Sequence, residues 1–290
     1  MPDLRVTSVI ELLKPITWFA PMWAYMCGAI SAGPQLQENW QLVAVGIILA
    51  GPLVCGASQA LNDWFDRHVD AINEPNRPIP SGRIPGAWGL YIAIFGFGLA
   101  IAVSSFLGPW VMVAAGVAIL CGWAYSAPPL RLKQNGWLGN LACGVCYEGL
   151  PWFTAAAVAA TTLPDIRTVT LALLYSLGAH GIMTLNDFKA MEGDRALGIK
   201  TLPVQLGMTN AARLACIVMA TPQLAVIIFL IHWGAPVYSV VVSALLLAQF
   251  ALMPRFLKEP ERLAPWYNAT GTSLFVLGML VSAFALRSLV

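Results

Sequence analysis

Residues 61–82 read LNDWFDRHVDAINEPNRPIPSG and directly follow a long apolar run. The stretch begins with an amide and three carboxylates spaced along one segment: Asn62, Asp63, Asp66 and Asp70. The whole chain is 58% hydrophobic and only 10% charged, whereas a soluble domain carries roughly 25% charged residues. So few charges cannot cover a globular surface, and the composition predicts an all-α integral membrane protein.

About nine apolar segments are long enough to cross a bilayer, for which about 20 mainly apolar residues suffice. They lie near residues 16–33, 42–61, 87–106, 110–126, 138–160, 168–186, 211–231, 236–254 and 269–288. We expect them to form a single polytopic domain over residues 1–290, a bundle of about nine transmembrane helices with lipid around it.

The connections between these segments alternate between short, nearly uncharged loops and longer polar ones. The polar connections are 62–86, 127–137, 187–210 and 254–267. Together with the N-terminal segment they hold 13 of the 16 Lys and Arg residues. Arg213 lies just inside the span that follows 187–210, on the same side, and only Arg167 and Arg287 lie on the opposite side. Since cytoplasmic loops carry the excess of Lys and Arg, we expect the N-terminus and the polar loops to be cytoplasmic. The C-terminus would then face the opposite side of the membrane.

Two short motifs resemble each other across the chain. The first motif, residues 62–70, and the second motif, residues 186–194, both begin with Asn-Asp after a leucine, continue with an aromatic residue and place another Asp seven positions after the first. Four spans separate them, so both leave the membrane on the same side. This pattern indicates a parallel pseudo-repeat of a four-helix unit, with one extra span at the C-terminal end.

The first motif suits a divalent metal. On a helix, Asp63, Asp66 and Asp70 share one face at positions i, i+3 and i+7. Three stacked carboxylates repel one another unless cations lie among them. Mg²⁺ prefers one or two carboxylates together with water and substrate phosphates, and Mn²⁺ would accept the same oxygens. Asn62 adds a ligand oxygen or a donor to phosphate.

The second motif and the residues after it mix acids with cations. The candidates are Asn186, Asp187, Lys189, Glu192, Asp194, Arg195 and Lys200. Two acidic faces with cations alongside suit a diphosphate held through bridging metal ions, which also makes it a good leaving group. Arg77 lies between prolines in the first polar loop and would present its guanidinium to the same diphosphate.

Two polar residues within the spans leave alternatives open. Glu148 is costly in hydrocarbon, so it should face the interior of the bundle. It is either protonated and hydrogen-bonded, for example to Tyr147 or Tyr175, or it contacts the polar part of a substrate. His180 is either an interior packing residue or a ligand to something in the cavity.

A cation transporter or channel is the alternative class of function. A transporter would place its acids near the middle of spans, whereas here they gather at the ends, which favours an enzyme. No nucleic-acid partner is expected.

The phrase NDWFDRHVDAINEPNRPIPSGRI resembles the N-D-x-x-D-x-x-x-D signature of the UbiA superfamily of intramembrane prenyltransferases, and the similarity covers essentially the whole chain. The phrases YSAPPLRLKQNGWLGN and TLNDFKAMEGDRALGIKTLPVQLG are similar to the chlorophyll and bacteriochlorophyll synthase branch. CYEGLPWF looks most like the bacteriochlorophyll type. A quinone or haem prenyltransferase of the same superfamily is the second interpretation, and a carrier of tetrapyrroles is the alternative outside the enzyme class.

The resemblance implies a helical bundle around a central cavity, closed by cytoplasmic cap loops. It implies transfer of a geranylgeranyl or phytyl group from its diphosphate to the propionate of bacteriochlorophyllide or chlorophyllide. By motif match, the first motif would form one magnesium–diphosphate site, Asp187 and Asp194 the second, and Arg77 would contact diphosphate. Many members carry another Asp three residues after the position of Asp187, where this chain has Ala190. Glu192 replaces that ligand, or the second metal is held more weakly. Tyr147, Glu148 and His180 are the candidate contacts to the pigment.

Overall fold

The computed structural model describes residues 5–290, and its regular elements are helices. The N-terminal half comprises α1 Val6–Leu13, η1 Pro15–Trp18, α2 Phe19–Ser31, α3 Gln35–Glu38, α4 Trp40–Ile48, η2 Leu49–Cys55, α5 Gly56–Asn73, α6 Trp88–Leu107 and α7 Pro109–Ser126. There follow η3 Leu132–Gln134, α8 Gly136–Gly144, η4 Val145–Gly149, α9 Leu150–Ala160, α10 Ile166–Asp187, η5 Phe188–Ala190, α11 Met191–Ala196, α12 Leu202–Leu206, α13 Met208–His232, α14 Pro236–Lys258 and α15 Pro260–Arg287.

Eight continuous helices within residues 5–290 are long and apolar enough to cross a membrane. They match eight of the nine predicted spans, because α4–η2–α5, α8–η4–α9 and α10–η5–α11 each run on as one helix. The remaining predicted span, 16–33, is η1 followed by α2, which has only 13 residues. Helix α2 packs between α9 and α15 and fully buries Ala24 and Cys27. The predicted all-α bundle of about nine helices is therefore confirmed, with a short first member.

Two of the long helices contain a widened, π-helical turn next to a proline. In η2 the proline is Pro52, and η4 is followed at once by Pro151. A proline ring clashes with the carbonyl four residues earlier and leaves that carbonyl without its usual donor. A π-turn absorbs the clash without breaking the helix. In η4 this turn sets the orientation of Tyr147 and Glu148.

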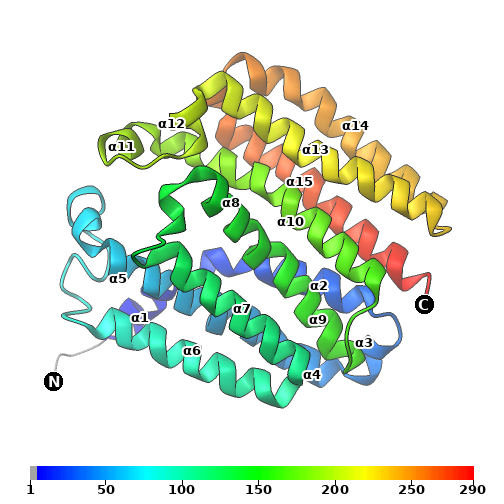
Figure 1. Cartoon of the computed structure of the whole chain (residues 1–290), viewed down its shortest axis with the longest axis horizontal. Coiled ribbons are helices and arrows are strands. Elements are labelled where there is room, and N and C mark those ends of the chain that lie inside the picture. Colours follow the sequence, from blue (N-terminus) through cyan, green and yellow to red (C-terminus); the bar gives the residue numbers. More distant parts are fainter. Residues whose placement is uncertain (1–4) are drawn as a thin grey trace.

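The polar connections gather at one end of the bundle (Figure 1). Helices α1, α11 and α12 and the loop between α5 and α6 lie at that end, whereas α3 and the C-terminus lie at the other end. The predicted separation of the long polar loops from the C-terminus is thus present. That the polar end faces the cytoplasm stays a prediction, and so does the four-helix repeat.

Small residues bring the helices into close contact. A Cβ at Gly28 of α2 would lie 2.1 Å from the carbonyl oxygen of Trp152 in α9, and one at Gly181 of α10 would lie 2.6 Å from that of Ala215 in α13. Backbones at this distance gain the dispersion contacts that hold helices together where burial from water cannot. The second of these contacts fixes α10, whose end carries the second motif.

Candidate functional site

The first motif occupies the last turns of α5. The side chains at i, i+3 and i+7 share one face, as predicted, and that face is turned inward. Asp63 is 1% exposed and Asp70 is 6% exposed, while Asp66 is partly buried. Carboxylates so far from water require cations or donors close by.

Lys14 and Arg77 supply two of these cations. The Nζ atom of Lys14 lies 2.6 Å from Oδ1 of Asp63. The Nη1 atom of Arg77 donates to Oδ2 of Asp70 at 2.8 Å and lies 3.6 Å from Oδ1 of Asp63. Burial lowers the pKa of Arg77, but the neighbouring carboxylates outweigh it and raise this pKa above its ordinary value. The guanidinium is therefore permanently charged.

Asp66 faces a second basic pair, from the loop between α7 and α8. Nη2 of Arg131 donates to Oδ1 of Asp66 at 2.9 Å, and Nζ of Lys133 lies 2.5 Å from both carboxylate oxygens. With its amide oriented to satisfy both neighbours, Asn62 donates to Asp66 and accepts from Lys133, each at 3.1 Å. Burial lowers the pKa of Lys133, and the charge of Asp66 opposes that shift.

Sequence reasoning identified Arg77 but not Lys14, Arg131 or Lys133 as residues of the site. The available signal was their position, since all three lie in segments predicted to share the side of the first motif. The result is four basic side chains interleaved with three acids, a composition suited to a diphosphate accompanied by metal ions.

The second motif begins at the end of α10. Asp187 is the last residue of α10, and its Oδ2 accepts from Nδ2 of Asn140 in α8 at 3.1 Å. Asp194 lies seven residues later, in α11, and is half-buried. Asn186 is engaged elsewhere, because its Oδ1 accepts from Nδ2 of Asn268 in α15 at 2.8 Å.

The other candidates after the second motif lie on the surface of η5, α11 and the segment before α12. Lys189, Glu192, Arg195 and Lys200 are exposed, and none forms an ion pair with another residue of 5–290. The backbone of Lys200 is engaged instead: its N–H donates to the carbonyl of Gln134 at 3.0 Å. This contact joins the loop that carries Lys133 to the segment that follows the second motif.

A cavity of about 180 Å³ opens beside the first motif and runs into the bundle. Asn62 lies at its polar end, and Leu49 lies 13 residues earlier on the same helix, about 20 Å along its axis. The lining residues are Pro21, Leu49, Ala50, Val54, Cys55, Ser58, Gln59, Asn62, Ala114, Ala115, Ala118, Cys121, Gly122, Tyr125, Ser126, Ala142, Cys143, Cys146, Tyr147, Leu150, Pro151 and Thr154. The cavity is thus narrow and mostly apolar, with a polar mouth.

Tyr125 and Tyr147 are the aromatic side chains of this lining. The hydroxyl of Tyr147 accepts from Nε2 of Gln59 at 2.9 Å, which fixes the ring. The predicted site residue Tyr147 therefore does face the cavity.

Glu148 is not among the residues that line the cavity. It is 5% exposed, and its Oε2 has no hydrogen-bond partner among residues 5–290. The hydroxyl of Tyr175 is paired with Ser282 at 2.7 Å. Within residues 5–290, Glu148 therefore forms neither of the predicted hydrogen bonds, to the hydroxyl of Tyr147 or to that of Tyr175. His180 is also buried with an unpartnered Nδ1, and its ring centroid lies 5.9 Å from that of Trp137.

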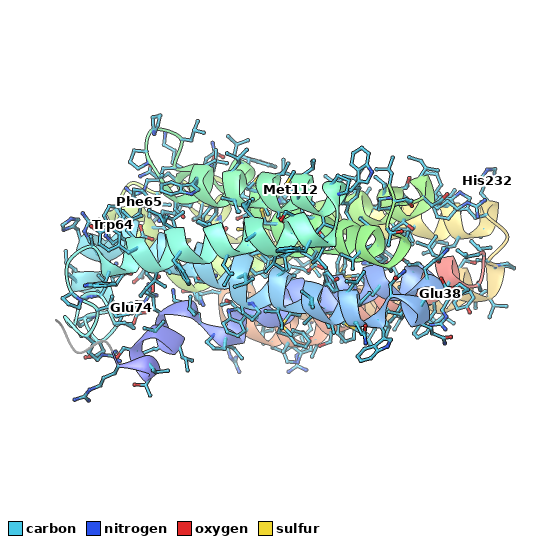
Figure 2. All side chains as sticks on the ribbon, turned by 90° about the horizontal axis from the view of Figure 1, so that it is seen from below. Glu38, Trp64, Phe65, Glu74, Met112 and His232 are labelled. Atoms are coloured by element: carbon cyan, nitrogen blue, oxygen red, sulfur yellow. The ribbon has the colours of Figure 1, made fainter. Side chains whose placement is uncertain are left out.

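The acidic face lies at one end of the molecule and not at its middle. Figure 2 shows Trp64, Phe65 and Glu74, from the first motif and its continuation, at one end, while Glu38 and His232 lie at the other. A transporter would need its acids midway along the bundle. The observed placement agrees with chemistry at a membrane surface.

The acids fit a metal that shares its ligands with a substrate. No group of three or more His, Cys, Asp or Glu side chains within residues 5–290 lies close enough to hold an ion by itself. However, Oδ2 of Asp63 is buried and has no hydrogen-bond partner in the described chain. One or two carboxylates with phosphate and water oxygens are the usual Mg²⁺ environment, and this donor set supplies them.

The chain has extensive sequence relatives. The profile of the UbiA prenyltransferase family matches residues 21–285. The bacteriochlorophyll synthase 33 kDa chain of Cereibacter sphaeroides is 57% identical over 100% of this chain and 95% of that protein. The chloroplastic chlorophyll synthase of Arabidopsis thaliana is 40% identical over 95% of this chain and 73% of that protein.

The fold also matches solved structures. A UbiA homologue from Archaeoglobus fulgidus, bound to GPP and Mg²⁺, aligns with a TM-score of 0.77 at 20% identity, over 97% of this chain and 99% of that one. A digeranylgeranylglyceryl phosphate synthase aligns with a TM-score of 0.73 at 21% identity, over 96% and 98% of the two chains. At such low identity the likeness shows a shared fold.

Proposed function

Because the chain belongs to the UbiA prenyltransferase family, we propose that it esterifies the propionate of bacteriochlorophyllide or chlorophyllide with a geranylgeranyl or phytyl group. The family and the enzyme class that the two motifs predicted are confirmed by the family match and by 57% identity to a bacteriochlorophyll synthase. The reaction belongs to the last steps of (bacterio)chlorophyll synthesis, and the donor is the corresponding prenyl diphosphate.

One observation carries this proposal: an acidic and basic cluster lies at the mouth of a narrow apolar cavity. Asn62 belongs to both the first motif and the cavity lining. A prenyl diphosphate has the same polarity, with a charged head joined directly to an apolar tail. The diphosphate would lie among the residues of the two motifs, and the tail would extend past Tyr147 toward Leu49.

The residues at the head of the cavity have distinct roles. Asp63, Asp66 and Asp70 of the first motif, with Asp187 and Asp194 of the second, would hold Mg²⁺, and Glu192 is the additional candidate ligand. When bound, the metal would neutralise diphosphate charge and so make it a better leaving group. Arg77 and Lys133 would contact the remaining phosphate oxygens, with Arg131, Lys189, Arg195 and Lys200 nearby.

The bond changes need little from a general base. The allylic C–O bond breaks and its electron pair leaves with the diphosphate, while a propionate oxygen forms a new C–O bond to the same carbon. The propionate is already ionised near neutral pH, since carboxyl groups titrate at about 4. Tyr125 and Tyr147 line the cavity, and their aromatic rings would stabilise positive charge on the allyl group.

The acceptor would approach from the side of Glu148 and His180. Both are buried and each has an unpartnered polar atom within residues 5–290, so each could bond a polar group of the pigment. Asn186 would act indirectly, because Asn268 already donates to it.

A reconstituted reaction tests the proposal. Purified protein in detergent would receive geranylgeranyl or phytyl diphosphate and either pigment, with Mg²⁺, Mn²⁺ or EDTA, and pigment esters would be separated by chromatography. We expect ester only with a divalent metal, and none from the Asp63→Asn variant. If folded wild-type protein makes no ester with either pigment but prenylates a quinone precursor or haem, the acceptor assignment is wrong.

A further inference from the structure

We infer that Lys14 acts as an internal substitute cation: its ammonium neutralises Asp63 until a metal ion binds there, and the metal displaces it. The inference rests on the metal site proposed above at Asp63. It adds a residue outside both motifs, and it makes a prediction about metal binding that is independent of catalysis.

The first argument is the environment of Asp63. Its side chain is 1% exposed, yet only one of its oxygens is engaged by protein: Oδ1 lies 2.6 Å from Nζ of Lys14 and 3.6 Å from Arg77. Oδ2 is buried and has no hydrogen-bond partner in the described chain. A carboxylate in such surroundings is costly without a cation, and Lys14 is the nearest one. The unpartnered Oδ2 is therefore available as a ligand to a metal ion, which would also bind water and phosphate oxygens.

The second argument is how Lys14 is held. It links α1 to η1 in a left-handed backbone conformation with φ of 48°, directly before Pro15. Non-glycine residues adopt this conformation rarely, and residues before proline avoid helical conformations. Helix α1 is kept in place by the fully buried Leu12 and by both carboxylate oxygens of Glu11, which accept from Arg83. The backbone of Lys14 is therefore fixed beside α5.

The side chain of Lys14 differs from its backbone in being free to move. It is 25% exposed, and a lysine ammonium is a compact charge on a flexible four-carbon stem. A divalent ion on Asp63 would repel this ammonium, so the ion pair and the metal exclude each other. Once displaced, Lys14 can reach the diphosphate oxygens that arrive with the metal. Lys14 thus weakens the binding of a metal ion alone and strengthens the binding of a metal ion together with diphosphate.

The test is Mg²⁺ binding without any substrate. Thermal unfolding in detergent, followed by tryptophan fluorescence, would be measured in EDTA and across a Mg²⁺ titration for wild type, Lys14→Met and Lys14→Arg. Arg262→Met is the matched control, since it removes a cation that is 79% exposed and paired with Glu259. We expect Lys14→Met to melt lower than wild type in EDTA. We also expect it to be stabilised by Mg²⁺ with a midpoint on the order of tenfold lower, while Lys14→Arg and Arg262→Met resemble wild type. Conversely, diphosphate with Mg²⁺ should bind Lys14→Met more weakly.

Other outcomes overturn the inference. An unchanged or higher Mg²⁺ midpoint in Lys14→Met would show that the lysine does not compete with metal. If Lys14→Met does not fold in EDTA, the double variant with Asp63→Asn should fold, because an amide needs no cation; failure of the double variant would assign Lys14 a purely structural role. If Mg²⁺ has no effect on the unfolding of wild type, both the proposed metal site at Asp63 and the proposed role of Lys14 are wrong. Wild type that binds Mg²⁺ yet makes no pigment ester would refute the reaction and leave the role of Lys14 standing.

Discussion

Replacing Ala118 by phenylalanine should shorten the prenyl donor that the enzyme can use. Ala118 lies in α7, is 8% exposed and lines the cavity together with Ala114 and Ala115 on the same helix. A phenyl ring at this position would project into a cavity of only about 180 Å³. The far part of the cavity, near Leu49, would no longer be reachable from the first motif.

The size of the loss in activity follows from the length of prenyl tail that the phenyl ring would exclude from the cavity. If the ring displaces one isoprene unit of five carbons, the lost burial is about 4 kcal/mol at about 0.8 kcal/mol per methylene. This corresponds to a fall of roughly 1,000-fold in kcat/KM for the geranylgeranyl donor. A geranyl donor, two isoprene units shorter, should lose less than about tenfold, because its tail ends before the obstruction.

The assay is the esterification reaction with geranyl and geranylgeranyl diphosphate at matched metal concentration. Leu120→Phe is the matched control, since Leu120 lies on the same helix but is 69% exposed toward the surroundings of the bundle. It should leave both donors unaffected. Equal losses for the two donors in Ala118→Phe would mean that the tail does not occupy this cavity, and so would no loss with either.

Two further predictions concern folding. Gly28→Ala should destabilise the protein by about 1–3 kcal/mol, because the new Cβ would lie 2.1 Å from the carbonyl oxygen of Trp152. Gly98→Ala is the control, since nothing lies within 4 Å of the new atom, and it should be neutral or stabilising by up to about 1 kcal/mol. Unfolding in denaturing detergent would measure the stability of both variants. Equal stabilities would contradict the close contact of α2 with α9. The hydrogen bond from Arg83 holds the pKa of Glu11 below its ordinary value of 4.5. The ion pair should therefore protect α1 above about pH 4.5 and be lost as the pH falls through the lowered pKa, an effect that Glu11→Gln should abolish in limited proteolysis of α1.

Much of the architecture could be predicted because it depends on local composition. A bilayer requires about 20 apolar residues per span, so hydropathy alone located the span near 87–106 almost at the bounds of the helix Trp88–Leu107. It also located the start of the span near 42–61, although that helix, Trp40–Asn73, continues well past residue 61 through the first motif. Helical periodicity likewise placed Asp63, Asp66 and Asp70 on one face, because their spacing in the sequence alone determines it. The span at 16–33 was the least well predicted, because η1 precedes α2 and shortens it.

The partners of these acids were decided only by the tertiary structure. Lys14 and Asp63 are 49 residues apart in sequence, and Lys133 and Asp66 are 67 apart. Asn140 lies 47 residues from Asp187. No local pattern marks such pairs, since they depend on which helices are neighbours and how each is rotated.

The cavity gives the same lesson. The spans contain many aromatic residues, but within the described chain only Tyr125 and Tyr147 among them line the cavity, and much of the remaining lining is small residues such as Ala114, Ala115 and Ala118. Large side chains fill the space between helices, so an open volume forms where small ones face each other. Composition and periodicity therefore determined the membrane bundle and the acidic motifs. Helix packing, through contacts between distant residues, determined which cations neutralise the acids and where a substrate tail can lie.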